Sequence, residues 1–517
     1  MAAGLAFTGA SSASPQSRGT GLLADSVRTA LSAVLGRAEV GLLAISLDRG
    51  DTLAAVNPAL RLTPGSSAKL LTTSAYLRRF GAAARCTTYV AARGKAKRDN
   101  GRVRLKGDLF LRGSGAPDVT QLLSPGSRGL LDSLAFLLRV GGLEQFEGTL
   151  WIDGTLFANE PYAPSWALED IPHAYGAPVN AILANGNAAS LVATVGPRGV
   201  TLALEPPEVP ITLDATVSMA AAGQPGWLDV DRKPFERRLR VRGSVPPDGA
   251  VRTQISVPDP DSAAGLMLLG AMRRAGTEVK KARVRVVSHA GSPDPSGREG
   301  RVSIAGAATG WGQVSKDRPA VVLAHASPTA AEMVGIVNAV SLNAEAEALL
   351  RLLDGAPAEK HRDAGLREVR SSAVEAGVDS LDLSLVDGSG LSRQNLLTAR
   401  SLVRWLWSLD QDSALAAPFR DRLATPGALG TLKNRFPGLD PRRDLRAKTG
   451  SLMNVSSLAG YVRTTGGERV AFAIITNGNR GSIAPARQME EEVVGMLSRF
   501  ERDAAIGPPV PPPGIPR

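Results

Sequence analysis

The sequence predicts an α+β fold in which an antiparallel sheet flanked by helices is interrupted by a large, mostly β insertion. The two ends of the chain each carry a helix and strand-like runs, so both are expected to contribute to one layered domain. The middle of the chain instead carries short strand-like runs among many glycines and prolines. With 517 residues, 43% of them hydrophobic, the chain is too long for one ordinary core, and two or three domains are expected.

The first elements are a helix and two strands. Residues 40–47 and 53–56 are expected to be strands, joined across the Asp-Arg-Gly-Asp turn at 48–51. We interpret the Arg-Gly-Asp in this turn as hairpin chemistry and not as an adhesion motif. Before it, a helix starts at Asp25 and can end at Gly36, because apolar residues recur at helical spacing at Val27, Leu31, Val34 and Leu35.

The next element, a helix at 66–81, carries a candidate nucleophile. Pro64 and Gly65 are expected in a tight turn, and the helix can end at Gly81 through a left-handed residue. Lys69 follows Ser66 by three positions, so both side chains share one face of the helix. A hydroxyl and an ammonium group are therefore predicted within hydrogen-bond reach.

This pair can activate a serine without histidine. A hydroxyl is a poor nucleophile at neutral pH, and a desolvated lysine whose pKa is lowered by a neighbouring cation can take its proton. The backbone N–H of Ser66, near the positive helix start, is available to help hold an oxyanion. Taken alone, SxxK is a short pattern that also fits a surface helix with an incidental serine and lysine.

The insertion is expected in the middle of the chain. Residues 103–111, 148–152 and 190–195 are short strand-like runs, and 262–275 leads back as a helix. Beyond it, a helix-like run at 330–353 is interrupted at Ser-Leu-Asn, which is therefore expected on a loop between two helices. The 275 residues from Ser66 to Ser341 are far more than one or two helices need.

The C-terminal part is predicted to complete the first domain. Period-two alternation at 445–451 predicts a strand, and at the edge of a sheet it would let an extended peptide add beside it. Residues 458–464 and 469–476 are expected strands, and 484–500 an acidic-then-apolar helix. The tail at 504–517 is rich in proline and is expected to be extended.

Three motifs with catalytic chemistry occur in order: SxxK at 66–69, SxN at 341–343 and KTG at 448–450. With them the chain resembles the low-molecular-mass class C penicillin-binding proteins, the D-alanyl-D-alanine carboxypeptidase/endopeptidase family. Leu342 departs from the aspartate that this family more often has. Longer segments also resemble that family, in the same order: GDLFLRGSGAPDVT, WIDGTLFANE, YGAPVNAILANGN, PDPDSAAGLMLLGAMRRAG and VDGSGLSRQN.

The resemblance implies a β-lactamase/transpeptidase-like domain carrying two extra, mostly β domains, one nested in the other. An ordinary β-lactamase lacks this insertion. The implied division is a signal-like or flexible N-terminus at 1–24, a transpeptidase-like domain at 25–92 and 306–503, inserted domains at 93–305 and a proline-rich tail at 504–517.

The resemblance also implies catalytic roles. Ser66 would be the nucleophile and Lys69 its base. Ser341 would relay a proton between Lys69 or Lys448 and the leaving group. Asn343 would donate to the substrate amide and contact Lys69, and Lys448 would supply positive charge near Ser66 and the terminal carboxylate of the substrate.

Six residues are implied to bind substrate: Thr449, Gly450, Ser451, Leu391, Arg393 and Asp153. Gly450 would leave room for the peptide, and the backbone N–H of Ser451 would complete the oxyanion hole. Leu391 would line the cleft. Arg393 would hold a carboxylate at the far end of the peptide side chain, since its planar fork pairs bidentately, and Asp153 would hold the amino group there.

The implied reaction is two-step acyl transfer on peptidoglycan stem peptides ending in D-Ala-D-Ala, with cross-link endopeptidase action at the same centre. β-Lactams are expected to acylate Ser66, and no metal or organic cofactor is expected. Three alternatives remain: a β-lactamase or esterase with the same SxxK centre, an inactive cell-wall-binding relative, and a basic nucleic-acid binder.

Composition narrows these classes. A formal charge of +11 and a pI near 10.1 suit an anionic surface, but aromatic residues make up only 4%, which leaves little stacking surface for nucleic acid. Four histidines lack metal-ligand spacing, no GxSxG occurs, and the single Cys86 cannot form an intrachain disulfide.

The first residues, MAAGLAFTGASSASPQSRG, resemble the end of a secretory signal peptide but lack its positively charged start. A periplasmic or extracellular location is therefore expected, with the signal incomplete or the start misassigned. No apolar run reaches the roughly 18 residues that a transmembrane helix needs. The sequence leaves the oligomeric state unknown.

Overall fold

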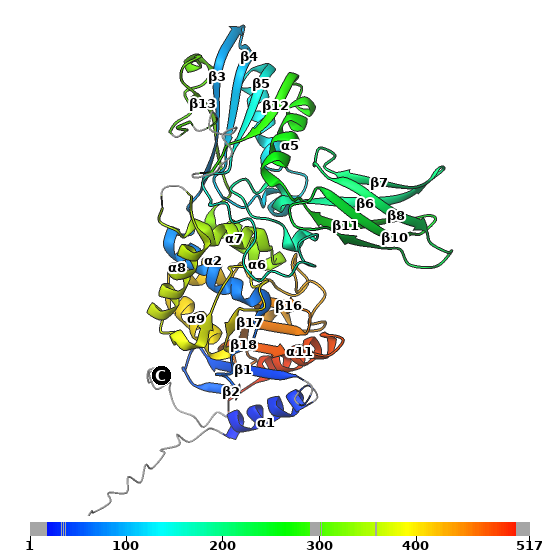
Figure 1. The fold of residues 1–517 in the computed structure, drawn as a ribbon. Helices are drawn as coiled ribbons and strands as arrows, with labels where there is room; N and C mark the ends of the chain where they lie inside the picture. The colour runs from blue at the N-terminus through cyan, green and yellow to red at the C-terminus, as the bar shows by residue number, and fades with distance from the viewer. Residues whose placement is uncertain are drawn as a thin grey trace, which may run out of the picture.

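The computed structural model describes residues 18–502, apart from 33, 35, 37, 290–299, 301, 305 and 357–358. It confirms the predicted α+β fold, with a helix-flanked antiparallel sheet and further sheets from a long insertion (Figure 1). Within the described part of the chain, no helix combines the length and apolar character that crossing a membrane requires. The signal-like segment up to residue 17 and the predicted tail lie outside it.

Both ends of the chain build one five-stranded antiparallel sheet in the order β16-β17-β18-β1-β2 (Figure 1). β1 (Glu39–Ser46) pairs with β2 (Thr52–Val56) on one side and with β18 (Arg469–Asn477) on the other. β17 (Val455–Arg463) and β16 (Arg446–Leu452) follow. β16 is thus a strand, as its alternation predicts, and it lies at the edge of the sheet.

Helices cover both faces of this sheet. α1 (Arg18–Ser32), which begins before the predicted Asp25, packs with α11 (Ala484–Arg499) on the face that carries Phe472. α9 (Ala399–Gln411) lies on the face that carries Ala473. Neighbouring residues of β18 therefore enter opposite apolar layers, because side chains alternate along a strand.

The face of the sheet that carries Ala473 also supports the helices nearest the candidate site. They are α2 (Lys69–Phe80), α6 (Ala330–Val340), α7 (Asn343–Leu352), α8 (Arg362–Glu375) and α10 (Ala416–Arg420). A short ribbon of β14 (Leu383–Ser384) and β15 (Leu396–Leu397) lies close by, since Leu62, just before α2, bridges to Leu397.

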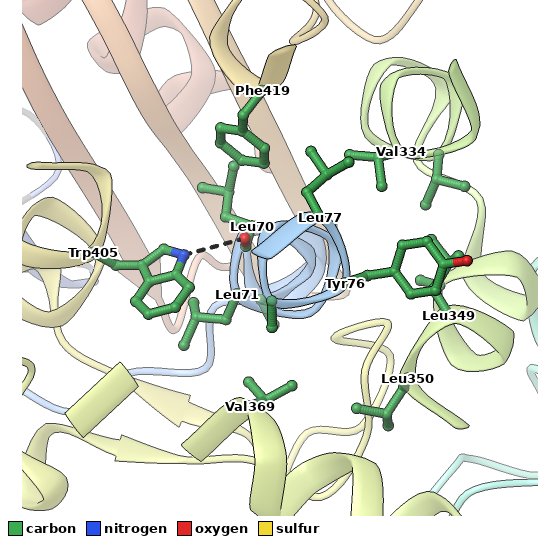
Figure 2. Close-up of a cluster of buried hydrophobic side chains, with 14 of the residues drawn as sticks. Leu70, Leu71, Tyr76, Leu77, Val334, Leu349, Leu350, Val369, Trp405 and Phe419 are labelled. Carbon is green, nitrogen blue, oxygen red and sulfur yellow. Dashed lines mark hydrogen bonds between the residues drawn. The ribbon is translucent and has the colours of Figure 1, made fainter. Parts of the chain in front are cut away.

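Helix α2 lies at the centre of this layer. Figure 2 shows Leu70, Leu71 and Leu77 surrounded by side chains from other segments, with the Trp405 indole donating to the carbonyl of Leu70 at 3.3 Å. All residues of α2 from Lys69 to Leu77 are buried. Because burial of one leucine side chain stabilises by roughly 1.5–3 kcal/mol, this packing holds the helix rigidly.

The insertion begins with a second five-stranded sheet in the order β12-β5-β4-β3-β13. β4 pairs in parallel with β5, and β5 with β12; the other pairs are antiparallel. α4 (Leu130–Val140) and α5 (Pro260–Arg274) pack on one face, and α3 (Thr120–Leu123) is a single turn. The strands are β3 (Thr87–Asp99), β4 (Arg102–Arg112), β5 (Leu143–Asp153), β12 (Glu278–Val286) and β13 (Ala320–Ala326).

Six strands lie between β5 and α5 in the sequence and form two three-stranded sheets, β11-β6-β7 and β8-β10-β9. In Figure 1 they project sideways from the rest of the molecule. This unit is nested inside the first inserted one, as predicted. The strands are β6 (Ala188–Gly196), β7 (Gly199–Glu205), β8 (Thr212–Met219), β9 (Trp227–Asp231), β10 (Arg238–Val245) and β11 (Ala250–Ser256).

The sheet of the insertion extends beyond the predicted limits of 93–305. Residues 87–92 are the first half of β3, and β13 pairs with them in antiparallel register. These two segments lie far apart in the sequence. Because they pair with each other, both belong to the inserted sheet. Local patterns carry no information on such pairing.

Candidate active site

Ser66 and Lys69 meet where the chain enters α2. Ser66 lies in the 3₁₀ turn η1 (Gly65–Ala68), and Lys69 is the first residue of α2. The ammonium Nζ of Lys69 donates to Ser66 Oγ at 2.8 Å. The i, i+3 spacing thus brings the two groups together, as helical geometry requires.

The Lys69 amine has three acceptors. Its Nζ lies 2.8 Å from Ser66 Oγ, 2.6 Å from Asn343 Oδ1 and 2.5 Å from the carbonyl oxygen of Ser389. If Lys69 loses one proton, two N–H bonds can stay on Asn343 and Ser389. The lone pair then faces the hydroxyl of Ser66, which is the geometry of a general base.

Burial brings the pKa of Lys69 into the neutral range. The side chain is fully buried, and desolvation lowers its pKa to about 7, although the carboxylates of Asp387, Glu347 and Glu345 oppose the fall. Glu345 is itself buried, and burial raises its pKa to about 7. The three carboxylates therefore limit the shift that burial produces.

The SxN segment turns the chain between two helices. Ser341 ends α6 in the left-handed conformation, with φ 67° and ψ 43°, and Asn343 is the first residue of α7. Besides accepting from Lys69, Asn343 donates through Nδ2 to the carbonyl of Tyr175 at 2.8 Å. Tyr175 belongs to the insertion, in the turn η2 (Ala174–Gly176). Asn343 therefore links α2 to the inserted part of the chain.

The KTG segment lies on the edge strand β16. Lys448 Nζ donates to Ser341 Oγ at 2.8 Å and to the carbonyl of Thr449 at 2.7 Å. Lys448 is fully buried, and burial together with the charge of Lys69 places its pKa well below the usual value. A second amine thus contacts the hydroxyl of Ser341.

Glycines allow β16 to touch the turn that carries Ser66. A Cβ on Gly450 would lie 2.4 Å from the carbonyl oxygen of Pro64 and 3.0 Å from the backbone N of Ser66. Likewise, a Cβ on Gly65, whose φ is +52°, would lie 3.1 Å from the backbone N of Ser451. The N–H groups of Ser66 and Ser451 are therefore close neighbours, as two oxyanion donors must be.

Buried hydroxyls join the two segments behind this contact. Ser457 on β17 donates to the carbonyl of Pro64 at 2.6 Å, and its Oγ lies 2.7 Å from Ser67 Oγ. Both serines are almost completely buried. Because buried polar groups are costly when unpaired, these bonds hold the turn of Ser66 against the sheet.

The loop from 386 to 395 supplies one acceptor for Lys69. Asp387 accepts from the backbone N–H groups of Gly390 at 2.8 Å and Ser392 at 2.7 Å, and from the Trp166 indole at 2.9 Å. Gly390 has φ +78°, and a Cβ there would lie 2.0 Å from the carbonyl oxygen of Gly65. Close backbone approach therefore requires glycine.

Glu347, one helical turn after Asn343 on α7, clamps the same loop. Its Oε1 accepts from the backbone N–H groups of Gly388 and Ser389, each at 2.8 Å. Its other carboxylate oxygen lies 3.5 Å from Arg351 Nη1, and both side chains of this ion pair are buried. The clamp fixes the carbonyl of Ser389 that accepts from Lys69.

The residues predicted to bind substrate differ in their surroundings. Thr449 donates to the hydroxyl of Thr431 at 2.8 Å, whereas the exposed Ser451 accepts from Arg487 at 3.1 Å. Leu391 is only 5% exposed and packs in the core around α2. It therefore supports the loop more than it lines an open cleft.

Arg393 and Asp153 are not brought together. Arg393 is exposed and donates to the carbonyl of Met453, in the turn after β16, at 3.1 Å. Asp153 ends β5, where its carboxylate accepts from the N–H and hydroxyl of Thr155 and lies 4.0 Å from Arg112. These partners within the insertion occupy Asp153, so the expectation that it reaches the site is not supported.

Asp170 of the insertion lies close enough to Arg393 for their charges to interact. Burial raises the pKa of Asp170, and the positive charge of Arg393 opposes that rise. Asp170 also neighbours Tyr175, whose pKa is raised to about 12 by burial and by the charge of Asp170. The predicted role of Asp153 stays a prediction, and Asp170 is a second acidic candidate in the insertion.

Sequence reasoning also missed three other residues of the site. The clamp of Glu347 could have been suspected, because i, i+4 spacing places it on the same helix face as Asn343. No local signal marks the carbonyl of Ser389 or the guanidinium of Arg487. Their roles depend on contacts between segments that are distant in the sequence.

Known proteins resemble this chain over most of its length. A model of the D-Ala-D-Ala carboxypeptidase 3 (S13) family matches residues 24–294 and 302–500. The D-alanyl-D-alanine carboxypeptidase of Actinomadura sp. (strain R39) is 31% identical over 459 residues, which cover 85% of this chain and 78% of the relative. DacB of Haemophilus influenzae is 24% identical over 482 residues, 89% of this chain and 91% of the relative.

Solved structures show a similar fold. Penicillin binding protein 4 (dacB) from Haemophilus influenzae matches with a TM-score of 0.70 and 21% identity, over 92% of this chain and 99% of that one. The same protein in complex with a β-lactam matches with a TM-score of 0.65, also at 21% identity, over the same shares of both chains. The predicted transpeptidase-like architecture with inserted domains is therefore shared.

Proposed function

The chain belongs to the D-Ala-D-Ala carboxypeptidase 3 (S13) family, and from this premise we propose that Ser66 hydrolyses peptidoglycan stem peptides ending in D-Ala-D-Ala through an acyl-enzyme. The observation that carries the proposal is the 2.8 Å contact between Lys69 Nζ and Ser66 Oγ. Because burial lowers the pKa of Lys69 to about 7, a large share of the amine is neutral at physiological pH and can act as base.

Acylation starts with attack by Ser66 on the carbonyl carbon of the penultimate D-alanine. Lys69 takes the hydroxyl proton as the new bond forms, while the N–H groups of Ser66 and Ser451 hold the oxygen that becomes negative. Asn343 keeps the Lys69 amine oriented. This arrangement stabilises charge that exists only in the transition state.

Collapse of the tetrahedral intermediate needs a proton on the leaving amine. Ser341 can deliver it, because its hydroxyl contacts Lys448, which can replace the proton. The bond to the terminal D-alanine then breaks. After D-alanine leaves, Lys69 gives up the proton that it took from Ser66 and Lys448 regains one, both by exchange with solvent. Water then attacks the acyl-enzyme while neutral Lys69 takes its proton and passes it to Ser66 Oγ, which releases the shortened peptide.

The same centre supports two related reactions. DD-endopeptidase cleavage of a cross-link has the same D-alanine acyl donor and differs only in the leaving amine. A β-lactam places a strained amide at the position of the scissile bond, and its ring cannot diffuse away after Ser66 attacks. We therefore expect the enzyme to be acylated by penicillins.

The far end of the substrate side chain is assigned to Arg393 and Asp170. A guanidinium suits a carboxylate and a carboxylate suits an ammonium group, and the charges of these two residues interact. A side chain that ends in both an amino and a carboxyl group would satisfy the pair. Such an end is that of a diamino dicarboxylic acid.

An enzyme of this kind meets its substrate outside the cytoplasm, since peptidoglycan lies there. We therefore assign it an exported location, in line with the character of the first residues in the sequence. N-terminal sequencing of the protein recovered from its native cell envelope tests this assignment. A chain recovered only from the cytoplasm contradicts it.

Intact mass after treatment with benzylpenicillin tests the nucleophile. The native protein should gain the mass of one penicilloyl group, and Ser66→Ala should gain none because it lacks the attacking oxygen. Release of D-alanine from a D-Ala-D-Ala peptide should vanish in the same variant. An equal adduct on the variant, or no adduct on the native protein, contradicts the proposal.

One comparison separates this function from a β-lactamase. If penicillin is turned over rapidly and D-Ala-D-Ala peptides are left intact, the same centre serves as a β-lactamase. Slow loss of the penicilloyl adduct beside measurable release of D-alanine supports the carboxypeptidase.

A further inference from the structure

Arg487 brings a positive charge beside Ser451 of β16, and its guanidinium forms no ion pair with a carboxylate of the described residues. It lies in the first turn of α11 and is exposed. Its Nη2 donates to Ser451 Oγ at 3.1 Å, and Ser451 is exposed as well. Among the residues that the structure describes, Arg487 forms no ion pair within 4.0 Å. A guanidinium fork with one neutral partner retains several free N–H donors.

The backbone under Arg487 is held in place by another arginine. Arg435 donates through Nη2 to the carbonyl of Arg487 at 3.0 Å. It also pairs with Glu490 at 3.0 Å and with Glu491 at 2.8 Å. Ser456 on β17 donates to Glu490 at 2.7 Å. Glu490 and Glu491 on α11 thus pair with Arg435, although the charge of Arg487 also acts on Glu490, and these contacts fix the helix to the sheet.

The hydroxyls on this side of β16 are not equivalent. Thr449 uses its proton on Thr431, at 2.8 Å. Ser451 accepts a hydrogen bond from Arg487, so its own proton stays available to another acceptor. Lys448 is buried and donates to Ser341 and to the carbonyl of Thr449. Ser451 and Arg487 are therefore two neighbouring donors available to an anion at this place.

We propose that Arg487, together with the hydroxyl of Ser451, binds the carboxylate of the leaving D-alanine. This inference rests on the proposed function. The backbone N–H of Ser451 would hold the oxygen of the scissile carbonyl. The α-carbon of the leaving residue comes next along the peptide, so its carboxylate would lie beside the side chain of Ser451. A carboxylate there can accept from the serine O–H and from the guanidinium, which suits its planar geometry.

The consequence is selectivity for the leaving group. An amine that carries a carboxylate on its α-carbon gains the contact with Arg487, and an otherwise identical amine without that charge does not. Specificity arises because only the charged end pairs with the guanidinium, whereas a neutral end leaves it as it is in the free enzyme. Arg487 is thus a specificity-determining residue that contacts substrate and takes no part in proton transfer.

Steady-state kinetics on two peptides test this role. One ends in D-Ala-D-Ala with a free carboxylate, and the other is its C-terminal amide, which releases D-alaninamide. Arg487→Gln should lower kcat/KM for the free acid by roughly 3- to 10-fold, the range of a charged contact at an exposed site. It should leave kcat/KM for the amide within about twofold, and Arg487→Lys should retain part of the preference.

Arg499→Gln is the matched control, since it removes the same charge from the exposed last residue of the same helix. It should leave both substrates unaffected. Equal loss on both peptides with Arg487→Gln, or an unchanged ratio of acid to amide, overturns the inference, and thermal unfolding identifies a misfolded variant. If the native enzyme releases no D-alanine and is not acylated by penicillin, the proposed function fails and not the role of Arg487 alone.

Discussion

At the scale of single residues, the chemistry depends on the protonation of Lys69. Full burial disfavours the ammonium form, while three nearby carboxylates favour it, and the pKa of about 7 is the outcome. A lysine at the surface would stay protonated at neutral pH and could not accept the proton of Ser66. The buried position in α2 therefore makes lysine usable as a base.

This balance predicts a pH dependence of acylation. Below about pH 7 the protonated share of Lys69 rises, so the second-order rate constant for acylation should fall about tenfold for each pH unit. Above pH 7 the amine is neutral and the rate should level off. Stopped-flow acylation with a fluorescent penicillin between about pH 5 and 9 measures this profile. A rate that stays flat below pH 7 would rule out Lys69 as the base.

At the scale of elements, α7 and β16 position the groups around α2. α7 carries Asn343, which accepts from Lys69, and Glu347, which fixes the loop carbonyl that accepts from Lys69 as well. Two of the three acceptors of Lys69 thus depend on one helix. β16 closes the opposite side, through contact between Gly450 and the turn of Ser66.

Gly450→Ala should disable the site by separating these elements. The new methyl group would meet the carbonyl of Pro64 at 2.4 Å and the hydroxyl of Ser457 at 2.3 Å, so β16 must move away from Ser66. Overpacking of this kind costs about 1–3 kcal/mol. Displacement by about 1 Å can cost roughly 100-fold in rate, which penicillin acylation and thermal unfolding would measure.

Gly466→Ala is the control for this change, because a Cβ there would meet only the hydroxyl of Thr464, at 3.7 Å. This variant should keep both the native rate and the native unfolding temperature. Acylation of Gly450→Ala at the native rate would show that the close approach of β16 is dispensable.

At the scale of the whole molecule, the insertion is part of the site and not an appendage. Phe157, Trp166 and Leu183 of the insertion belong to the same core cluster as Leu349 and Leu350 on α7. Through this packing the carbonyl of Tyr175 reaches Asn343, and the charge of Asp170 in the same segment interacts with that of Arg393.

Asp170→Asn tests this contribution of the insertion. For a peptide whose side chain ends in a free amino group, kcat/KM should fall roughly 3- to 10-fold, as for a partly exposed charged contact. For the same peptide with the amine acetylated, the variant and the native enzyme should react equally. Asp153→Asn should change neither reaction, and a selective loss in that variant instead would restore the original assignment of Asp153.

The sequence by itself determined what depends on neighbours along the chain. Ser66 and Lys69 meet because three residues make nearly one helical turn, and period two at 445–451 already indicated the strand β16. The order of the elements was likewise indicated by local patterns, whereas the large β insertion followed from the spacing of the motifs and the family resemblance, with short strand-like runs in support.

Only the tertiary structure decided which distant groups meet. It joined β3 to β13, brought the charge of Asp170 near Arg393, and placed the carbonyl of Ser389 beside Lys69 and the guanidinium of Arg487 beside Ser451. Such contacts follow from how apolar faces pack and how strands pair across hundreds of residues. No periodicity within a single segment records them, because each segment carries only its own half of the contact.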